Sequence, residues 1–374
     1  MTSSPRLDRR SLIGGGALGM SGLMLPGCAT TQAARSVPTR CLPPVHVSVS
    51  RVIRTLVGLR PYRPSGFVVR AEPFADKRLV HNYGHGGAGI TLSWGTSRLA
   101  VDLGLQGHQG LVAVLGAGIV GLTTARLVQE AGFPVVIYAA ALPPETTSNI
   151  AGGQWMPSAH YRRAQVTPEW RAQYLAAVDY SYRRFQILVG DEYGVRWMRN
   201  YELSRNPIRA EGEEGIAPLQ PEARLLGPGD HPFDYPHVRQ FDSMIVEPPR
   251  FLRQIERDLR LAGARIAVRN FASPAEVAAL PERLVFNCTG LGARALFGDE
   301  ELTPIRGQLV VLLPQPEVDY ALIGDDGYMF ARSDGIILGG TFEHGEWSTT
   351  PDPETTTRIL AAHRGIVGGM RCVD

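Results

Sequence analysis

Residues 111–138 read LVAVLGAGIVGLTTARLVQEAGFPVVIY, and this stretch decides the fold. The apolar run Leu111 to Leu115 is typical of a buried parallel strand, and the amphipathic pattern that continues to about Ala131 predicts a helix. Gly132 is a helix stop signal, and the apolar run from Pro134 to Tyr138 predicts a second strand. The stretch therefore predicts a strand–helix–strand unit of a doubly wound α/β sheet.

A glycine fingerprint, GAGIVG, joins the first of these strands to the helix. Gly116 allows a tight turn, Gly118 lets the backbone approach a pyrophosphate, and Gly121 lets the helix pack closely on the strand. The first helical turn, with Ile119 and Val120, would bind that pyrophosphate at its positive end. Because strand, helix and strand flank the fingerprint at the right spacing, we interpret it as a dinucleotide site.

The composition fits a globular protein with room for two domains. The chain has 374 residues, of which 44% are hydrophobic and 20% charged, and these values argue against disorder. The formal net charge is +2, and the excess arises within the first 27 residues, so nothing indicates nucleic-acid binding. A pyridoxal enzyme needs a lysine in its active site, and the single lysine, Lys77, lies in a polar stretch, so this class of enzyme is disfavoured. The four cysteines show neither CxxC nor zinc-like spacing, and we expect no metal.

Residues 1–28 predict an export signal. Arg9-Arg10 precede an apolar, glycine-rich run that is too short to span a bilayer. The paired arginines resemble a twin-arginine signal. Leu25-Pro26-Gly27-Cys28 resembles a lipoprotein cleavage box with Cys28 acylated, although Pro26 departs from the usual small or aliphatic residue. We therefore expect a periplasmic or lipid-anchored protein with a tether over 29–44; an uncleaved N-terminal tail is the alternative.

The rest of the chain alternates strand and helix signals. Strands are predicted over 45–57, 67–70, 79–81, 265–269 and 284–286, and antiparallel strands over 305–342. Helices are predicted over 92–102, from the Thr167 cap with Pro168 at its first position, over 251–259 and over 355–363. Glycine-rich or small polar segments are predicted over 82–91, 104–110 and 145–155, and residues 203–236 are predicted to be irregular.

Two sets of motifs resemble one family. Residues 111–372 resemble the FAD-dependent D-amino acid oxidase family from its N-terminus onward. The matching motifs are GAGIVGL, residues 145–157, NCTG at 287–290, RGQ at 306–308 and LGGTF at 338–342. Residues 45–103 resemble the C-terminal part of the same family, in GLRPYRP at 58–64 and HNYGHGG at 81–87. The order of the two segments is reversed, so the chain looks circularly permuted, with 104–110 joining the old ends.

This order has consequences for the domains and for the new chain ends. The resemblance implies a Rossmann-type FAD-binding domain from 111–160 and 235–300. It implies a mixed or antiparallel-sheet substrate domain from 161–234 and 301–372. Residues 45–103 would carry the substrate arginine and the flavin-facing turn. Permutation would also make Cys41 and Cys372 neighbours. We hypothesise a disulfide between them, with two free thiols as the alternative.

The resemblance also implies a set of site residues. Arg60 would bind the substrate carboxylate, Tyr328 would add a second contact, and the carbonyl of Gly87 would accept from the amino group. The residues implied for FAD are Gly116, Gly118, Ile119, Val120, Gly121, Thr146, Thr147, Gln154, Trp155, Gly86, Gly89, Ile90, Thr91 and Gly290.

Two positions depart from the family pattern. Tyr138 is followed by Ala139, Ala140 and Ala141, with no acid for a ribose hydroxyl. A second family tyrosine falls near Gly324, so the lid is altered. We interpret His81 and His85 as structural, and Cys288 as a core thiol.

The implied activity is oxidative deamination of D-amino acids. A hydride passes from Cα to FAD, giving the 2-oxo acid, ammonia and, with oxygen as acceptor, hydrogen peroxide. The alternatives are a flavin amino-acid dehydrogenase, a glycine- or sarcosine-type oxidase, or an exported flavin-binding protein without turnover. A homodimer is left open.

Overall fold

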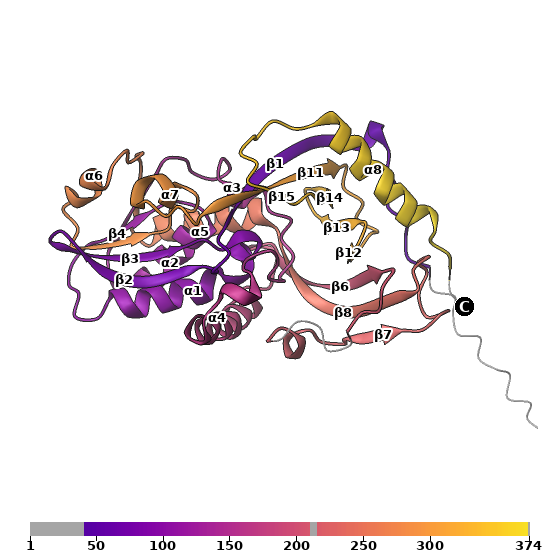
Figure 1. Cartoon of the computed structure of the whole chain (residues 1–374), viewed down its shortest axis with the longest axis horizontal. Coiled ribbons are helices and arrows are strands. Elements are labelled where there is room, and N and C mark those ends of the chain that lie inside the picture. The colour runs from indigo at the N-terminus through magenta and orange to yellow at the C-terminus, as the bar shows by residue number, and fades with distance from the viewer. Residues whose placement is uncertain (1–40, 210–214, 373–374) are drawn as a thin grey trace, which may run out of the picture. The chain divides into compact units, whose positions relative to one another are not determined.

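Two β-sheets carry the fold in the computed structural model, which describes residues 41–209 and 215–372. Both sheets belong to the unit 39–374, and Figure 1 shows them next to each other. The predicted export signal and most of the tether lie outside the described residues. Within the described residues, no helix has both the length and the apolar character needed to cross a bilayer.

The smaller sheet is the predicted nucleotide-binding sheet. Its strand order is β2 (Val68–Phe74), β3 (Lys77–Tyr83), β10 (Leu284–Asn287), β4 (Val112–Leu115), β5 (Val135–Ala139) and β9 (Arg265–Val268). All neighbours from β3 to β9 are parallel, and β2 pairs antiparallel with β3. The strand–helix–strand prediction is confirmed, because α2 (Ile119–Glu130) connects β4 to β5.

Both faces of this sheet are covered, which explains the unbroken apolar run of β4. Val112 and Val114 face one apolar cluster, whereas Ala113 and Leu115 face another. The first cluster includes side chains of α1 (Gly89–Gly104), α2, α4 (Pro168–Gln186) and α5 (Pro248–Leu261). The second includes side chains of α6 (Pro274–Ala278) and α7 (Gly292–Phe297). Such two-sided burial is typical of a parallel sheet.

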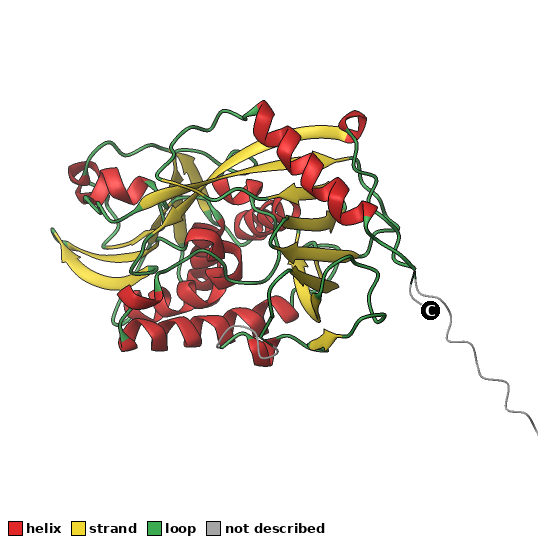
Figure 2. Cartoon of the chain, turned by 45° about the vertical axis from the view of Figure 1, so that its right-hand side comes forward, coloured by secondary structure: helices red, strands yellow, loops and turns green. Residues whose placement is uncertain are grey.

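The larger sheet has nine strands and is mixed. Its order is β1 (Val52–Tyr62), β11 (Thr303–Leu312), β14 (Gly335–Gly339), β13 (Gly327–Arg332), β12 (Tyr320–Gly324), β6 (Val195–Ser204), β8 (His237–Val246) and β7 (Arg224–Leu226), with β15 (Glu343–His344) on β11. Helix α8 (Pro353–Gly368) lies across one face of this sheet (Figure 2) and contributes Ile359, Leu360 and Ile366 to its core.

The segment that precedes the nucleotide strand completes both sheets. Strand β1 pairs with β11 from Val52 to Tyr62, and β3 lies beside β10. Because β1 is an edge strand, Pro61, which has no N–H to donate, is tolerated within it. The strand predicted over 45–57 begins only at Val52, after a short 3₁₀ turn, and continues through the proline-containing stretch.

Three elements differ from the sequence predictions. Strands β6 and β8 were not predicted. Their buried polar residues, such as Asn200 and Arg239, interrupt the apolar periodicity and instead make hydrogen bonds to Gln154 and Glu202. Strand β8 also lies in the larger sheet, although 235–300 was predicted to be nucleotide-binding. Helix α4, predicted within the substrate domain, packs on α1 instead.

The chain ends of the described region are joined covalently. Cys41 and Cys372 form a disulfide, with their Cα atoms 4.5 Å apart, so the hypothesised bond is confirmed. Cys288 is the free cysteine of the described residues and is buried, as predicted.

Candidate active site

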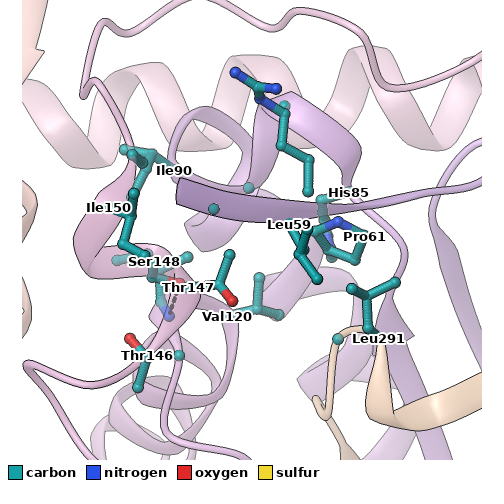
Figure 3. A pocket seen from close by; sticks show the side chains of 18 of the residues that line it. Leu59, Pro61, His85, Ile90, Val120, Thr146, Thr147, Ser148, Ile150 and Leu291 are labelled. Carbon is teal, nitrogen blue, oxygen red and sulfur yellow. Dashed lines mark hydrogen bonds between the residues drawn. The ribbon is translucent and has the colours of Figure 1, made fainter. Parts of the chain in front are cut away.

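A cavity of about 800 Å³ is lined by residues from both sheets. Figure 3 looks into it: side chains from β1 (Leu59), the start of α1 (Ile90), α2 (Val120) and α3 (Thr147–Ile150, with Ser148 labelled) point into the same space. The glycine turn over 84–89 and the fingerprint glycines Gly116 and Gly118 line it together. The two turns, far apart in sequence order, therefore form one site.

The fingerprint glycines are required by the backbone geometry. Gly116 has φ +103°, and a Cβ there would lie 2.5 Å from the carbonyl oxygen of Cys288. A Cβ on Gly121 would lie 2.0 Å from the carbonyl oxygen of Gly116, so helix α2 packs directly on the turn. A Cβ built on Gly118 would lie 3.1 Å from Ser148 Oγ. The Ser148 hydroxyl accepts a hydrogen bond from the Ile119 N–H at 3.0 Å. The helix N-terminus thus already binds an oxygen where a phosphate oxygen is expected.

Most of the predicted cofactor residues line this cavity, and three do not. The lining includes Gly116, Gly118, Ile119, Val120, Thr146, Thr147, Gln154, Gly86, Gly89, Ile90 and Gly290. Gly290 has φ +59°, and no atom lies within 4 Å of a Cβ built there, so this turn is open. Gly121 is not part of the lining and lies where helix α2 packs on the fingerprint turn.

The structure does not place the side chains of Trp155 and Thr91 in the cavity lining. Trp155 is 1% exposed and packs on Tyr182, with ring centroids 5.1 Å apart. Successive residues of an extended segment point to opposite sides, so Gln154 and Met156 line the cavity while Trp155 enters the core. Thr91 is buried in the first turn of α1, away from the lining.

One end of the cavity contains two residues, Arg269 and Phe271, that were not predicted from the sequence. Arg269 and Phe271 follow β9, and they lie there with Tyr138 and Ala139 at the end of β5 and with Ala140 and Ala141 just after it. The Arg269 guanidinium lies 4.5 Å from the Phe271 ring centroid and 5.9 Å from that of Tyr138. Because β5 and β9 are parallel neighbours, the residues after both strands meet at one sheet edge. Recognising that pairing would have identified them.

Arg60 lies at the other end, on β1, where the cavity meets the larger sheet. Its Nη1 donates to the carbonyl oxygen of Thr341 at 3.1 Å, and its guanidinium lies 4.6 Å from the Phe342 ring centroid. Gly307, on β11, makes room for the Arg60 guanidinium, because a Cβ on Gly307 would lie 2.4 Å from Arg60 Nη1. Among the described residues no carboxylate forms an ion pair with Arg60, so a half-buried cation faces the cavity without an anionic partner.

Tyr328 and Gly87 line the same cavity. The Tyr328 ring stacks on Phe330, with centroids 4.9 Å apart, and lies so close to Gly339 that a Cβ there would be 2.2 Å from it. The Gly87 N–H donates to the carbonyl oxygen of Ala159 at 3.2 Å, and a Cβ on Gly87 would lie 2.5 Å from the carbonyl oxygen of Ser158. The residues predicted to bind substrate therefore surround one space.

The histidines near this site are structural. His85 shares a hydrogen bond with Thr96 at 2.9 Å, and burial lowers the pKa of His85 to about 3. His160 lies behind Gly86, and burial, assisted by repulsion from His85, lowers its pKa to about 3. Both rings are neutral at physiological pH. The described residues hold no group of three or more His, Cys, Asp or Glu arranged for a metal ion.

The cavity fits FAD. Positive-φ glycines at Gly116 and Gly290 bring backbone to its wall without side chains. The positive end of α2 faces it, and the space continues from Arg269 at one end to Arg60 at the other. The fingerprint turn would hold the pyrophosphate, Thr146 and Thr147 would flank it, and the Gly86–Ile90 turn would face the flavin ring.

The comparison with known families decides the identity. The model of the FAD dependent oxidoreductase family (DAO) matches residues 2–103 and 112–370. The chain belongs to this family. It is an FAD-dependent oxidoreductase.

The chain is similar to D-amino-acid oxidases from two bacteria. It is 32% identical to that of Rubrobacter xylanophilus over 258 residues, 66% of this chain and 74% of that protein. It is also 32% identical to that of Streptomyces coelicolor over 277 residues, 71% and 81% of the two chains. Glycine oxidase from Geobacillus kaustophilus has the same fold at 15% identity, with a TM-score of 0.52 over 71% of this chain and 81% of that one.

Proposed function

We propose that this flavoenzyme oxidatively deaminates D-amino acids. The observation that carries the proposal is Arg60, a cation without an anionic partner among the described residues, in the same cavity as the nucleotide fingerprint. A guanidinium binds a carboxylate through two parallel hydrogen bonds. The curated relatives named D-amino-acid oxidase support the choice of substrate.

Three protein groups would hold the substrate. The Arg60 guanidinium binds the α-carboxylate, and the Tyr328 hydroxyl donates a further hydrogen bond to it. The Gly87 carbonyl accepts from the amino group, which fixes the direction of the Cα–H bond. When bound, FAD supplies a two-electron acceptor for the hydride from Cα. No side-chain acid or base is needed once the amine is neutral, because orientation lowers the barrier.

The products follow from the balance of atoms. Loss of hydride from Cα and of a proton from nitrogen leaves the imino acid, which water hydrolyses to the 2-oxo acid and ammonia. With oxygen as the final acceptor, the two electrons and two protons leave as hydrogen peroxide. A flavin dehydrogenase would make the same organic product without peroxide, and a glycine- or sarcosine-type oxidase would share the chemistry on a smaller substrate.

Oxygen uptake with paired enantiomers tests the proposal. We expect D-alanine and D-methionine to cause oxygen consumption with equal amounts of 2-oxo acid and peroxide, and the L-enantiomers to cause none. Oxo acid formed only with an added quinone or dye would make the protein a dehydrogenase. Turnover of neither enantiomer by FAD-loaded protein would contradict the proposal.

We also propose that the chain is a circular permutation of the family order. The family model matches two separate segments, and strands of the first segment complete both sheets. The Cα atoms of Cys41 and Cys372 are 4.5 Å apart, close to the ~3.8 Å between consecutive residues. A peptide link could therefore replace the disulfide.

A re-ordered chain tests this proposal. Starting at Leu111, running to Cys372 and continuing through a short glycine linker into 41–103, it should fold and bind FAD as the natural chain does. Insoluble protein, together with insolubility of variants carrying longer linkers, would contradict the permutation.

Export to the periplasm, with a lipid anchor at Cys28, is a further proposal. The Arg9-Arg10 pair and the disulfide both support it, since disulfides persist in oxidising compartments. Replacing Arg9 and Arg10 by lysine should keep the protein in the cytoplasm on cell fractionation, and Cys28→Ala should release it from the membrane fraction. Unchanged distribution of both variants would contradict export by this signal.

A further inference from the structure

The turn between β12 and β13 brings a carboxylate to the substrate end of the cavity. The two strands form a hairpin in which Gly324 pairs with Gly327 and Ile323 pairs with Tyr328. Asp325 lies in the turn between them, is exposed, and belongs to the cavity lining together with Tyr328. The acid therefore lies at the open rim, three residues from the tyrosine that is expected to contact substrate.

Only half of this carboxylate is used within the protein. Asp325 Oδ2 accepts from Ser204 Oγ and from the Arg205 N–H, both at 3.0 Å. Asp325 Oδ1 has no hydrogen-bond partner among the described residues, and no described cation forms an ion pair with this side chain. These two bonds fix the position of the carboxylate and leave its charge available to a ligand.

The adjacent acid behaves differently and provides a control. Asp326 Oδ2 accepts from Tyr235 Oη at 2.5 Å and lies 3.3 Å from Arg205 Nη2. Asp326 is not among the cavity residues. The positive charge of Arg205 is therefore paired with Asp326, and the turn keeps one uncompensated negative charge, that of Asp325.

Apolar side chains of the lining lie beside both groups, with Phe342 next to Arg60 and with Phe330 and Ile323 next to Tyr328. Ile323, Phe330 and Phe342 contribute apolar surface to the lining. Gly324 cannot carry a side chain, since a Cβ there would lie 2.1 Å from the carbonyl oxygen of Leu203 on the neighbouring strand β6. An aliphatic stem could lie along these apolar side chains and carry a polar end to the rim, as long basic side chains do.

We infer that the preferred substrates are D-amino acids with a long cationic side chain, of the D-arginine and D-lysine type. The inference rests on the proposed function: Arg60 binds the α-carboxylate, and Asp325 binds the side-chain cation at the opposite limit of the substrate space. The same charge disfavours D-glutamate and D-aspartate.

Matched substrate pairs test this preference. D-arginine and D-citrulline have nearly the same shape and differ in charge, and D-lysine and D-norleucine form a second pair. We expect kcat/KM to be about fivefold higher for the cationic member, the size of a part-exposed ion pair. The gain should fall mainly on KM, because the contact is far from the reacting bond, and should shrink at high ionic strength.

Two variants locate the cause. Asp325→Asn keeps an oxygen that can accept from Ser204 and Arg205 but removes the charge, so the arginine-to-citrulline ratio should fall to about one. Asp326→Asn together with Arg205→Gln removes the neighbouring ion pair, whose two charges cancel, and should leave that ratio unchanged.

Equal kcat/KM for both members of each pair would overturn the inference while the proposed function stands. A ratio that survives in Asp325→Asn would overturn the role of Asp325. If no D-amino acid of any charge is oxidised, the proposed function fails, and the inference fails with it.

Discussion

Arg60 is the residue on which substrate binding depends most. Replacing it by lysine keeps the positive charge but removes the planar fork that can bind a carboxylate through two bonds. We expect kcat/KM for D-amino acids to fall about 100-fold, equivalent to ~2.7 kcal/mol, while the flavin spectrum is unchanged. The measurement is steady-state kinetics on FAD-loaded protein.

Arg54→Lys is the matched control for this change. Arg54 lies on the same strand and pairs with Asp334 at 3.3 Å, outside the cavity, so its replacement should leave kcat/KM unchanged. Equal kinetics for Arg60→Lys and Arg54→Lys would contradict the carboxylate assignment.

His85 and His160 make stability depend on pH. Burial lowers the pKa of each to about 3, whereas in the unfolded chain the value is ~6.5. Between these values the unfolded state binds the proton and the folded state does not. The free energy of unfolding should therefore fall as the pH drops below 6.5, by up to ~1.4 kcal/mol per pH unit for each ring.

Urea unfolding at pH 7, 6 and 5 measures this dependence. His160→Gln should make the fall with pH shallower, whereas the exposed His46→Gln should leave it as in the natural protein. An equally steep fall in His160→Gln would show that this ring does not titrate as described.

Single residues were predictable from the sequence where the backbone demands a residue type. Gly116 and Gly121 were predictable because their turn and helix contact exclude a Cβ. Trp155 and Thr91 were not, since a matched motif fixes a position along the chain but not the side to which its side chain points. Asp325 could not be predicted from the sequence for a similar reason, because only the folded β12–β13 hairpin brings its turn to the cavity.

At the level of elements, the contact of α2 with the fingerprint turn should be the most sensitive point of the nucleotide site. Gly121→Ala would place a Cβ 2.0 Å from the carbonyl oxygen of Gly116, so the helix must shift away. We expect the free energy of unfolding to fall by ~1–3 kcal/mol and FAD to bind more weakly, measured by urea unfolding and FAD titration.

Gly365→Ala in α8 is the control for the effect of alanine in a helix. No atom lies within 4 Å of a Cβ built at Gly365, so this change should be neutral or stabilise by up to ~1 kcal/mol. FAD affinity unchanged in Gly121→Ala would contradict the role of this close contact.

The helices and strands that were predicted from the sequence are those in which apolar residues recur at regular spacing. β4, α2 and β5 carry local signals, and Thr167 caps α4 by accepting from the Trp170 N–H, as predicted. β6 and β8 were missed because polar residues inside them are satisfied by partners on other strands and loops. Such pairing exists only in the folded chain, so no local pattern reveals it.

At the scale of the whole molecule, the Cys41–Cys372 bond connects two residues that are 331 positions apart in sequence. Closing a long loop restricts the unfolded chain, and disulfides typically contribute ~2–4 kcal/mol. We expect Cys372→Ser to lower the melting temperature, and Cys41→Ser with Cys372→Ser to lower it no further, because the pair makes one bond.

Thermal unfolding without reductant makes this measurement, and reductant supplies its control. Dithiothreitol should lower the melting temperature of the natural protein to that of the double variant and leave the double variant unaffected. An unchanged melting temperature in both variants under oxidising conditions would contradict a stabilising bond.

Cofactor, substrate and handedness meet in one cavity, and an anaerobic visible spectrum of the purified protein examines all three together. Titration with D-arginine, D-methionine and their L-enantiomers would follow the flavin absorbance. We expect a yellow protein that the D-enantiomers bleach and the L-enantiomers leave unchanged, with colour returning when air is admitted. A yellow protein bleached by neither D-amino acid would contradict the proposed reaction, and a protein that stays colourless after incubation with FAD would contradict the cofactor site itself.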